Sequence, residues 1–225
     1  MKNFKESYKK ERQGYFATAD FSHNANDNGV AVKFFGASWA VPSAPVSPNN
    51  TALLDLMIAL RSNTNGTVLA STLTWYPDSQ AWFASCIYSD GGIDFTSKGR
   101  VKVEPGDILE AGISFVKRND MYSYIAHFVG EKFNSAAHAI KTTSAMNIAG
   151  VLFDAQPPEY INLPPDECVR VRNISVELPM LGGLPNPTDK IDWEFESGGV
   201  HTPSGRGGVL VDDSIGAGEI DFYFK

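Results

Sequence analysis

The side chains best placed to do chemistry are three carboxylates near the C-terminus, in the segment DWEFES. Asp192, Glu194 and Glu196 alternate there with Trp193 and Phe195. Alternate residues of a strand share a face, so neighbouring carboxylates would lie roughly 7 Å apart, near the separation of inverting glycosidases and beyond that of retaining ones. This spacing admits a polysaccharide hydrolase or lyase. The plainer alternative has the carboxylates in water and the aromatics in the core, which alternation alone predicts.

Other catalytic and metal sites are not indicated. None of His23, His127, His138 and His201 is paired at i, i+2 or i, i+4, and no G-x-S-x-G motif occurs. His127 lies within the apolar run IAHFV, where a hydrogen-bonded structural histidine is the commoner case. We therefore expect no metal and no cofactor.

Aromatic residues gather in the segment TWYPDSQAWFASCIY. It holds Trp75, Tyr76, Trp82 and Tyr88, and its turn YPDSQ would bring the two tryptophans together. Such residues can form the floor of a sugar-binding or peptide-binding groove, although a strand tryptophan more often belongs to the core. Both interpretations stay open from the sequence.

The strands that must position these residues are short and numerous. From Val30 onward, β-branched and aromatic segments alternate with Gly, Pro, Asn and Ser clusters, which indicates an all-β, two-sheet antiparallel β-sandwich. The apolar segment LLDLMIAL fits a central strand, and residues 135–149 fit strand, turn, strand. The alternating segments DWEFES and EIDFYF are expected to pair at a charged sheet edge.

Composition limits the partners. The 225 residues are 43% hydrophobic with a net charge of −7, which argues against nucleic acid or an anionic membrane as the main partner. No apolar run approaches the ~20 residues of a membrane span, and the start of the sequence has no secretory pattern, so we expect a cytoplasmic protein. The two cysteines are expected to be buried free thiols.

We expect one domain over residues 1–225, with a short charged N-terminal segment at residues 1–20. This segment holds the basic run of the chain, which consists of Lys2, Lys5, Lys9, Lys10 and Arg12. A short helix or frayed arm is the simpler interpretation, and a binding tail is the alternative.

The strand TVLASTLTW has one face made of small side chains, namely Ala70, Thr72 and Thr74. In a chain with 12% aromatic residues, such a face either packs under something or forms the floor of a groove.

Several segments, taken in order, carry a resemblance to a known family. They are ASWAVPSA, LMIALRSNTNGTVLASTLTW, AWFAS, EPGDILEAGISF, SYIAHFVGEKFNSAAHAI and NIAGVLFDA, within residues 34–178. Their order and spacing resemble the glutamic peptidases of fungi, the eqolisins. The resemblance implies two packed antiparallel sheets of concanavalin A-like type, one of them bent into a concave groove.

The resemblance also implies that the peptidase chemistry is missing. The family's glutamine strand reads roughly ILQTGFDW where this chain has VLASTLTW, which puts Ala70 at the glutamine. Its glutamate strand reads roughly NAEFIIED where this chain has IAGVLFDA, which puts Gly150 at the general acid/base, and a further groove carboxylate falls at Ala84. Asp154 shares a strand face with Gly150 but is four residues, roughly 13 Å, along the strand. General acid/base help is worth about 10²–10⁴-fold and an oxyanion donor about 10²–10³-fold, and alanine and glycine supply neither.

The sequence thus predicts a non-catalytic, eqolisin-like binding module, lectin-like or peptide-binding, with a glycan or a peptide in the concave groove. A carboxylate-based hydrolase or lyase and a structural, self-assembling protein are the alternatives, and a homo-oligomer is compatible with all three. The expected ligand-binding residues are Ala70, Thr72, Thr74, Trp75, Trp82, Ala84, Gly150 and Asp154.

Overall fold

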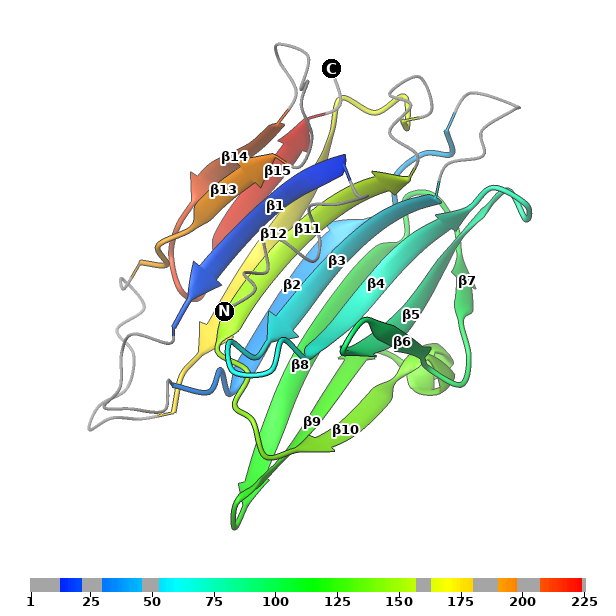
Figure 1. Cartoon of the computed structure of the whole chain (residues 1–225). Helices are drawn as coiled ribbons and strands as arrows, with labels where there is room; N and C mark the ends of the chain where they lie inside the picture. The colour runs from blue at the N-terminus through cyan, green and yellow to red at the C-terminus, as the bar shows by residue number, and fades with distance from the viewer. Residues whose placement is uncertain are drawn as a thin grey trace.

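The protein is described by a computed structural model that covers residues 13–21, 30–45, 53–156, 163–179, 190–197 and 207–223. Two antiparallel sheets pack face to face (Figure 1). The all-β sandwich predicted from the sequence is therefore confirmed. No helix among the described residues is long and apolar enough to cross a membrane.

The larger sheet, called sheet A, has the strand order β13-β1-β11-β3-β4-β5-β6, and β7 also pairs with β5. Its strands are β1 (Gln13–Asp20), β3 (Leu53–Arg61), β4 (Val68–Tyr76), β5 (Ala81–Asp90), β6 (Ile93–Thr96), β7 (Val101–Val103), β11 (Ile148–Gln156) and β13 (Glu194–Ser197).

The second sheet, called sheet B, has the order β10-β9-β8-β2-β12-β15-β14. Its strands are β2 (Phe34–Ala40), β8 (Ile108–Arg118), β9 (Met121–Phe128), β10 (His138–Thr142), β12 (Cys168–Glu177), β14 (Gly207–Asp212) and β15 (Gly218–Tyr223). A 3-10 helix, η2 (Glu131–Ala136), lies between β9 and β10.

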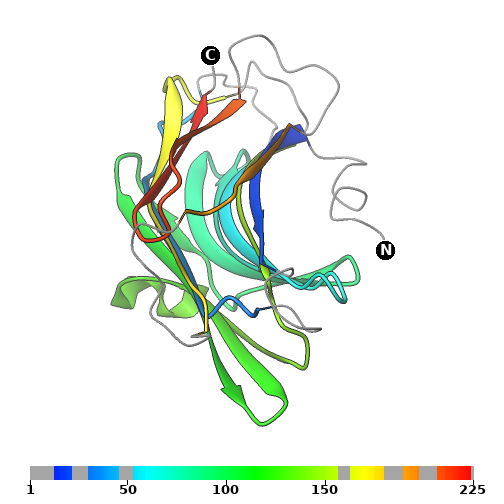
Figure 2. The same ribbon diagram turned by 90° about the vertical axis from the view of Figure 1, so that its left-hand side faces the viewer.

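The central strand β3 shows how the two faces of sheet A differ. The core between the sheets holds Leu54, Leu56, Ile58 and Leu60. The opposite face carries a separate apolar cluster, which consists of Phe16, Met57, Ala59, Val68, Ala70 and Leu152. We call the face of sheet A that is turned away from sheet B the outer face. Figure 2 shows that sheet A curves so that this outer face is concave.

Several local expectations can be compared with the structure. Residues 138–142 and 148–156 are strands separated by a turn, as predicted. The expected pairing of DWEFES with EIDFYF is wrong, because β13 borders sheet A and β15 lies inside sheet B. Part of the charged N-terminal segment, Gln13–Asp20, is strand β1 and pairs with β11 and β13; residues 1–12 lie outside the described residues.

The two cysteines are free but differ in environment. Cys86 is fully buried, and burial raises its pKa to about 11, while Cys168 is only half-buried. At pH 8 roughly one Cys86 thiol in a thousand would be ionised, and the thiolate is the reactive form. We expect Ellman's reagent to titrate one thiol in the native protein and two after denaturation. Rapid reaction of both native thiols would contradict the burial of Cys86.

Candidate functional site

The outer face of sheet A carries a row of very small side chains across three neighbouring strands. The strand register places Gly150 of β11 opposite Ala59 of β3, and Ala59 opposite Ala70 of β4. A Cβ added at Gly150 would come within 3.1 Å of Leu152 Cδ1. The side chain of Leu152 therefore lies over the glycine, and a larger residue at position 150 would have to displace it.

A second row lies next to the first and combines apolar and hydroxyl side chains. Leu152, Met57, Thr72 and Ser85 follow one another across β11, β3, β4 and β5. Thr72 Oγ1 donates to the carbonyl oxygen of Ser85 at 3.0 Å and lies 3.1 Å from Ser85 Oγ. The hydroxyl groups of Thr72 and Ser85 therefore find hydrogen-bond partners within the sheet itself.

A third row brings two carboxylates together. Asp154 of β11 is directly opposite Asp55 of β3, and Asp55 is directly opposite Thr74 of β4. Thr74 Oγ1 donates to Asp55 Oδ1 at 2.6 Å, and Asp154 is 1% exposed. Directly opposed residues of antiparallel strands have Cβ atoms about 4.5–5.5 Å apart, so the two carboxyl groups are close neighbours. Asp55 and Asp154 thus place two carboxylates side by side on the outer face.

The structure separates the predicted site residues into two sets. Ala70, Thr72, Thr74, Gly150 and Asp154 share the outer face, in the three adjoining rows described above.

The remaining predicted residues, Trp75, Trp82 and Ala84, lie on the opposite side of the sheet. They belong to the buried core between the sheets, where the two tryptophan rings meet edge-on at 5.5 Å. The expectation that these three residues bind a ligand in the groove is therefore corrected, because strand alternation turns odd residues of β4 and even residues of β5 inward. The two tryptophans do lie together, as the turn predicted.

Asp55 is a site residue that the sequence reasoning missed. It lies in β3, which was interpreted only as an apolar central strand. The available signal was its position as the single charged residue within LLDLMIAL. A charge inside a strand that is apolar on both faces marks a point where the strand meets a polar partner, here Thr74.

The carboxylates of DWEFES occupy the border of sheet A. Glu194 is exposed and lies opposite Thr18 of β1, while Trp193 is buried and Phe195 is exposed rather than in the core. The side chain of Glu196 lies outside the described residues. Exposure of Asp192 and Glu194 agrees with the water-facing alternative rather than with a pair of carboxylates enclosed in a site.

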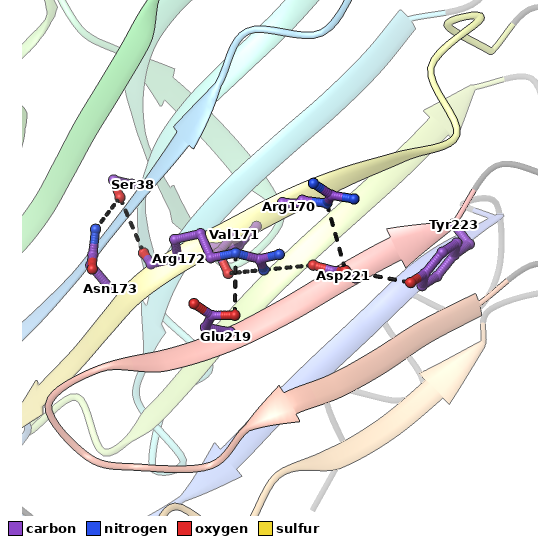
Figure 3. Close-up of polar contacts among 8 residues, drawn as sticks. All are labelled: Ser38, Arg170, Val171, Arg172, Asn173, Glu219, Asp221 and Tyr223. Atoms are coloured by element: carbon purple, nitrogen blue, oxygen red, sulfur yellow. Dashed lines mark hydrogen bonds and ion pairs between the residues drawn. The ribbon is translucent and has the colours of Figure 1, made fainter.

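A second polar cluster lies on the face of sheet B that is turned away from sheet A (Figure 3). Asp221 of β15 accepts a 2.6 Å hydrogen bond from Arg172 Nη1, and Arg172 Nε lies 3.3 Å from Glu219. Arg170 Nε lies 3.9 Å from the same aspartate, and the Tyr223 hydroxyl lies 3.5 Å from it. Each charge has an opposite charge beside it, so we assign the cluster a structural role.

A β-bulge positions this cluster. The register of β12 shifts at Asn173 against both neighbouring strands, β15 and β2. Asn173 has a φ of 53°. Asparagine tolerates this left-handed conformation better than most residues. Its amide donates to Ser38 Oγ at 2.9 Å, and Ser38 Oγ donates to the carbonyl oxygen of Arg172 at 3.3 Å. The bulge is thereby tied to β2, next to Arg172.

Comparison with known proteins gives a fold likeness only. No protein-family profile matches the chain, and no curated protein sequence matches it. Two crystal structures of scytalido-glutamic peptidase, one with a peptide-based transition state analog and one with a transition state analog inhibitor, each cover 95% of this chain and 98% of their own. Both have a TM-score of 0.55, at 13% and 12% identity.

A third solved structure is that of SCP-B, a member of the eqolisin family of peptidases, in complex with the tripeptide Ala-Ile-His. It covers 95% of this chain at 11% identity, with a TM-score of 0.49. From the two scytalido-glutamic peptidase structures, and at their level of identity, we conclude that this chain has the β-sandwich fold of the eqolisin peptidases.

Proposed function

We propose that the protein is a non-catalytic binding protein that holds an extended peptide on the outer face of sheet A. The observation that carries this proposal is the row Gly150, Ala59 and Ala70. The resemblance of the sequence motifs to those of the eqolisins implies that Gly150 and Ala70 stand where a glutamic peptidase has its acid/base and amide groups, and hydrogen and methyl side chains can neither activate water nor stabilise an oxyanion. Because these side chains are so small, a peptide backbone can come close to the sheet along this row.

Two features favour a peptide over a glycan. Trp75 and Trp82, which would have stacked on sugar rings, are buried in the core. The outer face instead combines an apolar cluster around Met57 and Leu152 with the carboxylates of Asp55 and Asp154. These groups suit the apolar and basic side chains of a peptide. One of the similar solved structures also holds a peptide-based transition state analog, which is support by fold analogy.

The experiment measures binding of a random peptide library to the protein and to two variants. Phe83 of β5 lies beside Thr74 on the outer face and is half-buried, so Phe83→Glu should be tolerated by the fold. We expect it to weaken peptide binding about tenfold or more, because each 1.4 kcal/mol of lost contact is a factor of ten. Ile125→Glu, at an exposed residue of β9 in sheet B, is the matched control and should bind as the wild type does. Equal weakening by both variants, or no bound peptide at all, would remove the support.

A second candidate function is hydrolysis at the same face, and the proximity of Asp55 and Asp154 favours it. Two neighbouring carboxyl groups can share one proton, so that one activates water and the other protonates a leaving group. This candidate predicts turnover that is lost in Asp154→Asn, which the binding proposal does not.

A further inference from the structure

We propose that Arg100, together with the rings of Tyr76 and Phe83, forms a carboxylate-binding subsite at the border of the outer face of sheet A. Its ligand group is a carboxylate, either an acidic side chain or the C-terminus of a peptide. That the carboxylate belongs to a peptide rests on the proposed function, whereas the position of the subsite rests on the contacts of Arg100.

Arg100 places its guanidinium over the outer face. It directly precedes β7, and Lys102 of β7 lies opposite Phe83 of β5. Phe83 in turn lies opposite Thr74, so it continues the third row of the outer face. The guanidinium carbon of Arg100 is 4.6 Å from the ring centroid of Tyr76 and 5.8 Å from that of Phe83. The cation therefore lies over the aromatic residues at the β5–β7 end of this face.

Neighbouring elements hold the backbone on both sides of Arg100. Ser97 is buried, and its hydroxyl donates to the carbonyl oxygen of Gly99 at 2.7 Å. The amide of Gly99 donates to the carbonyl oxygen of Ser135 in η2 at 2.8 Å, and a Cβ at Gly99 would come within 2.7 Å of Ser135 Oγ. Val101 then begins strand β7. Binding at Arg100 therefore does not have to order a loose loop first.

The guanidinium of Arg100 has donors to spare for a ligand. Among the described residues it makes neither an ion pair nor a hydrogen bond, whereas Lys102 is paired with Glu104 at 2.8 Å. Arginine presents its N–H donors in a planar fork that fits the two oxygens of a carboxylate, and such charge-assisted bonds are roughly twice as strong as neutral ones. An aromatic ring beside the guanidinium stabilises the cation without using these donors. A carboxylate is the ligand group that suits them.

The third row fixes the end of the face at which this carboxylate binds. Across β11, β3, β4, β5 and β7 the row consists of Asp154, Asp55, Thr74, Phe83 and Lys102. Lys102 is three strand spacings, roughly 14 Å, from Asp55. The row therefore has carboxylates at one end and a cation at the other, beside Arg100. Because complementary charges set the register of a bound ligand, an acidic group of the ligand is directed to the β7 end.

The first test uses small probes and needs no library peptide. Phenylglyoxal modifies accessible arginine side chains, and mass spectrometry of the full chain gives the rates at Arg100 and at Arg118, an exposed residue at the end of β8 in sheet B. Two probes are acidic: acetyl-Gly-Glu-amide has a side-chain carboxylate, and acetyl-Gly-Gln has a C-terminal carboxylate. The third, acetyl-Gly-Gln-amide, is neutral.

At millimolar concentration we expect at least one acidic probe to slow the modification of Arg100 about threefold or more, which corresponds to occupancy of about two thirds of the sites. The acidic probe that protects Arg100 identifies the source of the carboxylate. The neutral probe should leave Arg100 unprotected, and no probe should protect Arg118. Equal rates at Arg100 with all three probes, or equal protection of Arg118, would overturn the proposal.

The second test compares peptide selection by variants of the full chain. From the random library, the wild type should prefer peptides with a carboxylate about tenfold over their Asn, Gln or C-terminal amide counterparts. Arg100→Gln should lose this preference and still bind neutral peptides as the wild type does. Arg100→Lys, which keeps the charge without the planar fork, should retain part of it. The matched control Arg118→Gln should retain all of it.

The outcomes separate this subsite from the proposed function. Library binding without a preference for carboxylates, or with a preference that persists in Arg100→Gln, would overturn the subsite and leave the proposed function. Protection of Arg100 by an acidic probe without any bound library peptide would leave the subsite and remove the proposed function.

Discussion

Replacing Trp82 by alanine is expected to lower the free energy of unfolding by about 3–5 kcal/mol, because a buried aromatic side chain is lost and a cavity is left. Trp82 is 1% exposed and meets Trp75 edge-on, with the ring centroids 5.5 Å apart. Domains of this kind are stable by about 5–15 kcal/mol, so the variant should unfold at a much lower urea concentration. Urea denaturation followed by circular dichroism measures the change.

The neighbouring residue gives the matched control. Phe83 follows Trp82 on β5 but faces the outer side, where it meets Tyr76 edge-on and lies near Arg100. Because Phe83 is only half-buried, Phe83→Ala should cost about 1 kcal/mol, as half-exposed substitutions commonly do. A larger cost for Phe83→Ala than for Trp82→Ala would reverse the assignment of faces on β5. It would restore the interpretation of the tryptophans as part of the binding surface.

The second large effect is expected at the charge cluster on sheet B. Asp221 is 5% exposed and bonds to Arg172 at 2.6 Å, so Asp221→Ala leaves a partly buried guanidinium without its main partner. Breaking a buried ion pair in this way costs about 3–5 kcal/mol, and we expect about 3 kcal/mol because Arg172 keeps Glu219 at 3.3 Å. Thermal and urea unfolding of the variant measure the loss.

An exposed ion pair serves as the reference for this prediction. The side chains of Lys33 and Glu177 are 58% and 51% exposed, and surface pairs of this kind contribute about 0–1 kcal/mol. Glu177→Ala should therefore be nearly neutral. If Asp221→Ala proved equally neutral, the cluster would carry no structural role, and its place on sheet B would need a different explanation.

The alternation of residue types was enough to predict the β-sandwich and the set of residues that share the outer face of β4. It correctly grouped Ala70, Thr72 and Thr74 on one face of β4, and the order of motifs pointed to Gly150 and Asp154 on the strand that shares this face. The grouping on β4 depends only on the period of two along a strand, which is a local property, whereas Gly150 and Asp154 came from the resemblance to the eqolisins.

The remainder of the site depends on register, which the sequence does not contain. The resemblance put Ala84 in the groove, but it lies opposite Leu73 and therefore faces the core. Asp55 was missed because its importance comes from Asp154, nearly a hundred residues away in the chain, across a pair of strands that only the sheet order brings together. A one-residue change of register would have moved each of these side chains to the other face.

The charge cluster of sheet B could not be predicted from the sequence either. It depends on the bulge at Asn173, which shifts the register of β12 against both neighbouring strands. The alternation of EIDFYF is consistent with Asp221 facing away from the core, but it does not predict that Arg172 lies beside Asp221 and buries it. Bulges add one residue to one strand and cannot be located from periodicity alone.

Whether the outer face of sheet A holds a peptide without cutting it is tested most directly by one measurement. The protein is incubated with a mixed peptide library from pH 2 to pH 7, and the peptides are then weighed by mass spectrometry beside an Asp154→Asn control. We expect bound peptides to be recovered intact across this range and both proteins to give the same masses. Cleavage products that form with the wild type and vanish in Asp154→Asn would contradict it, and would establish the carboxylates of Asp55 and Asp154 as an acid/base pair.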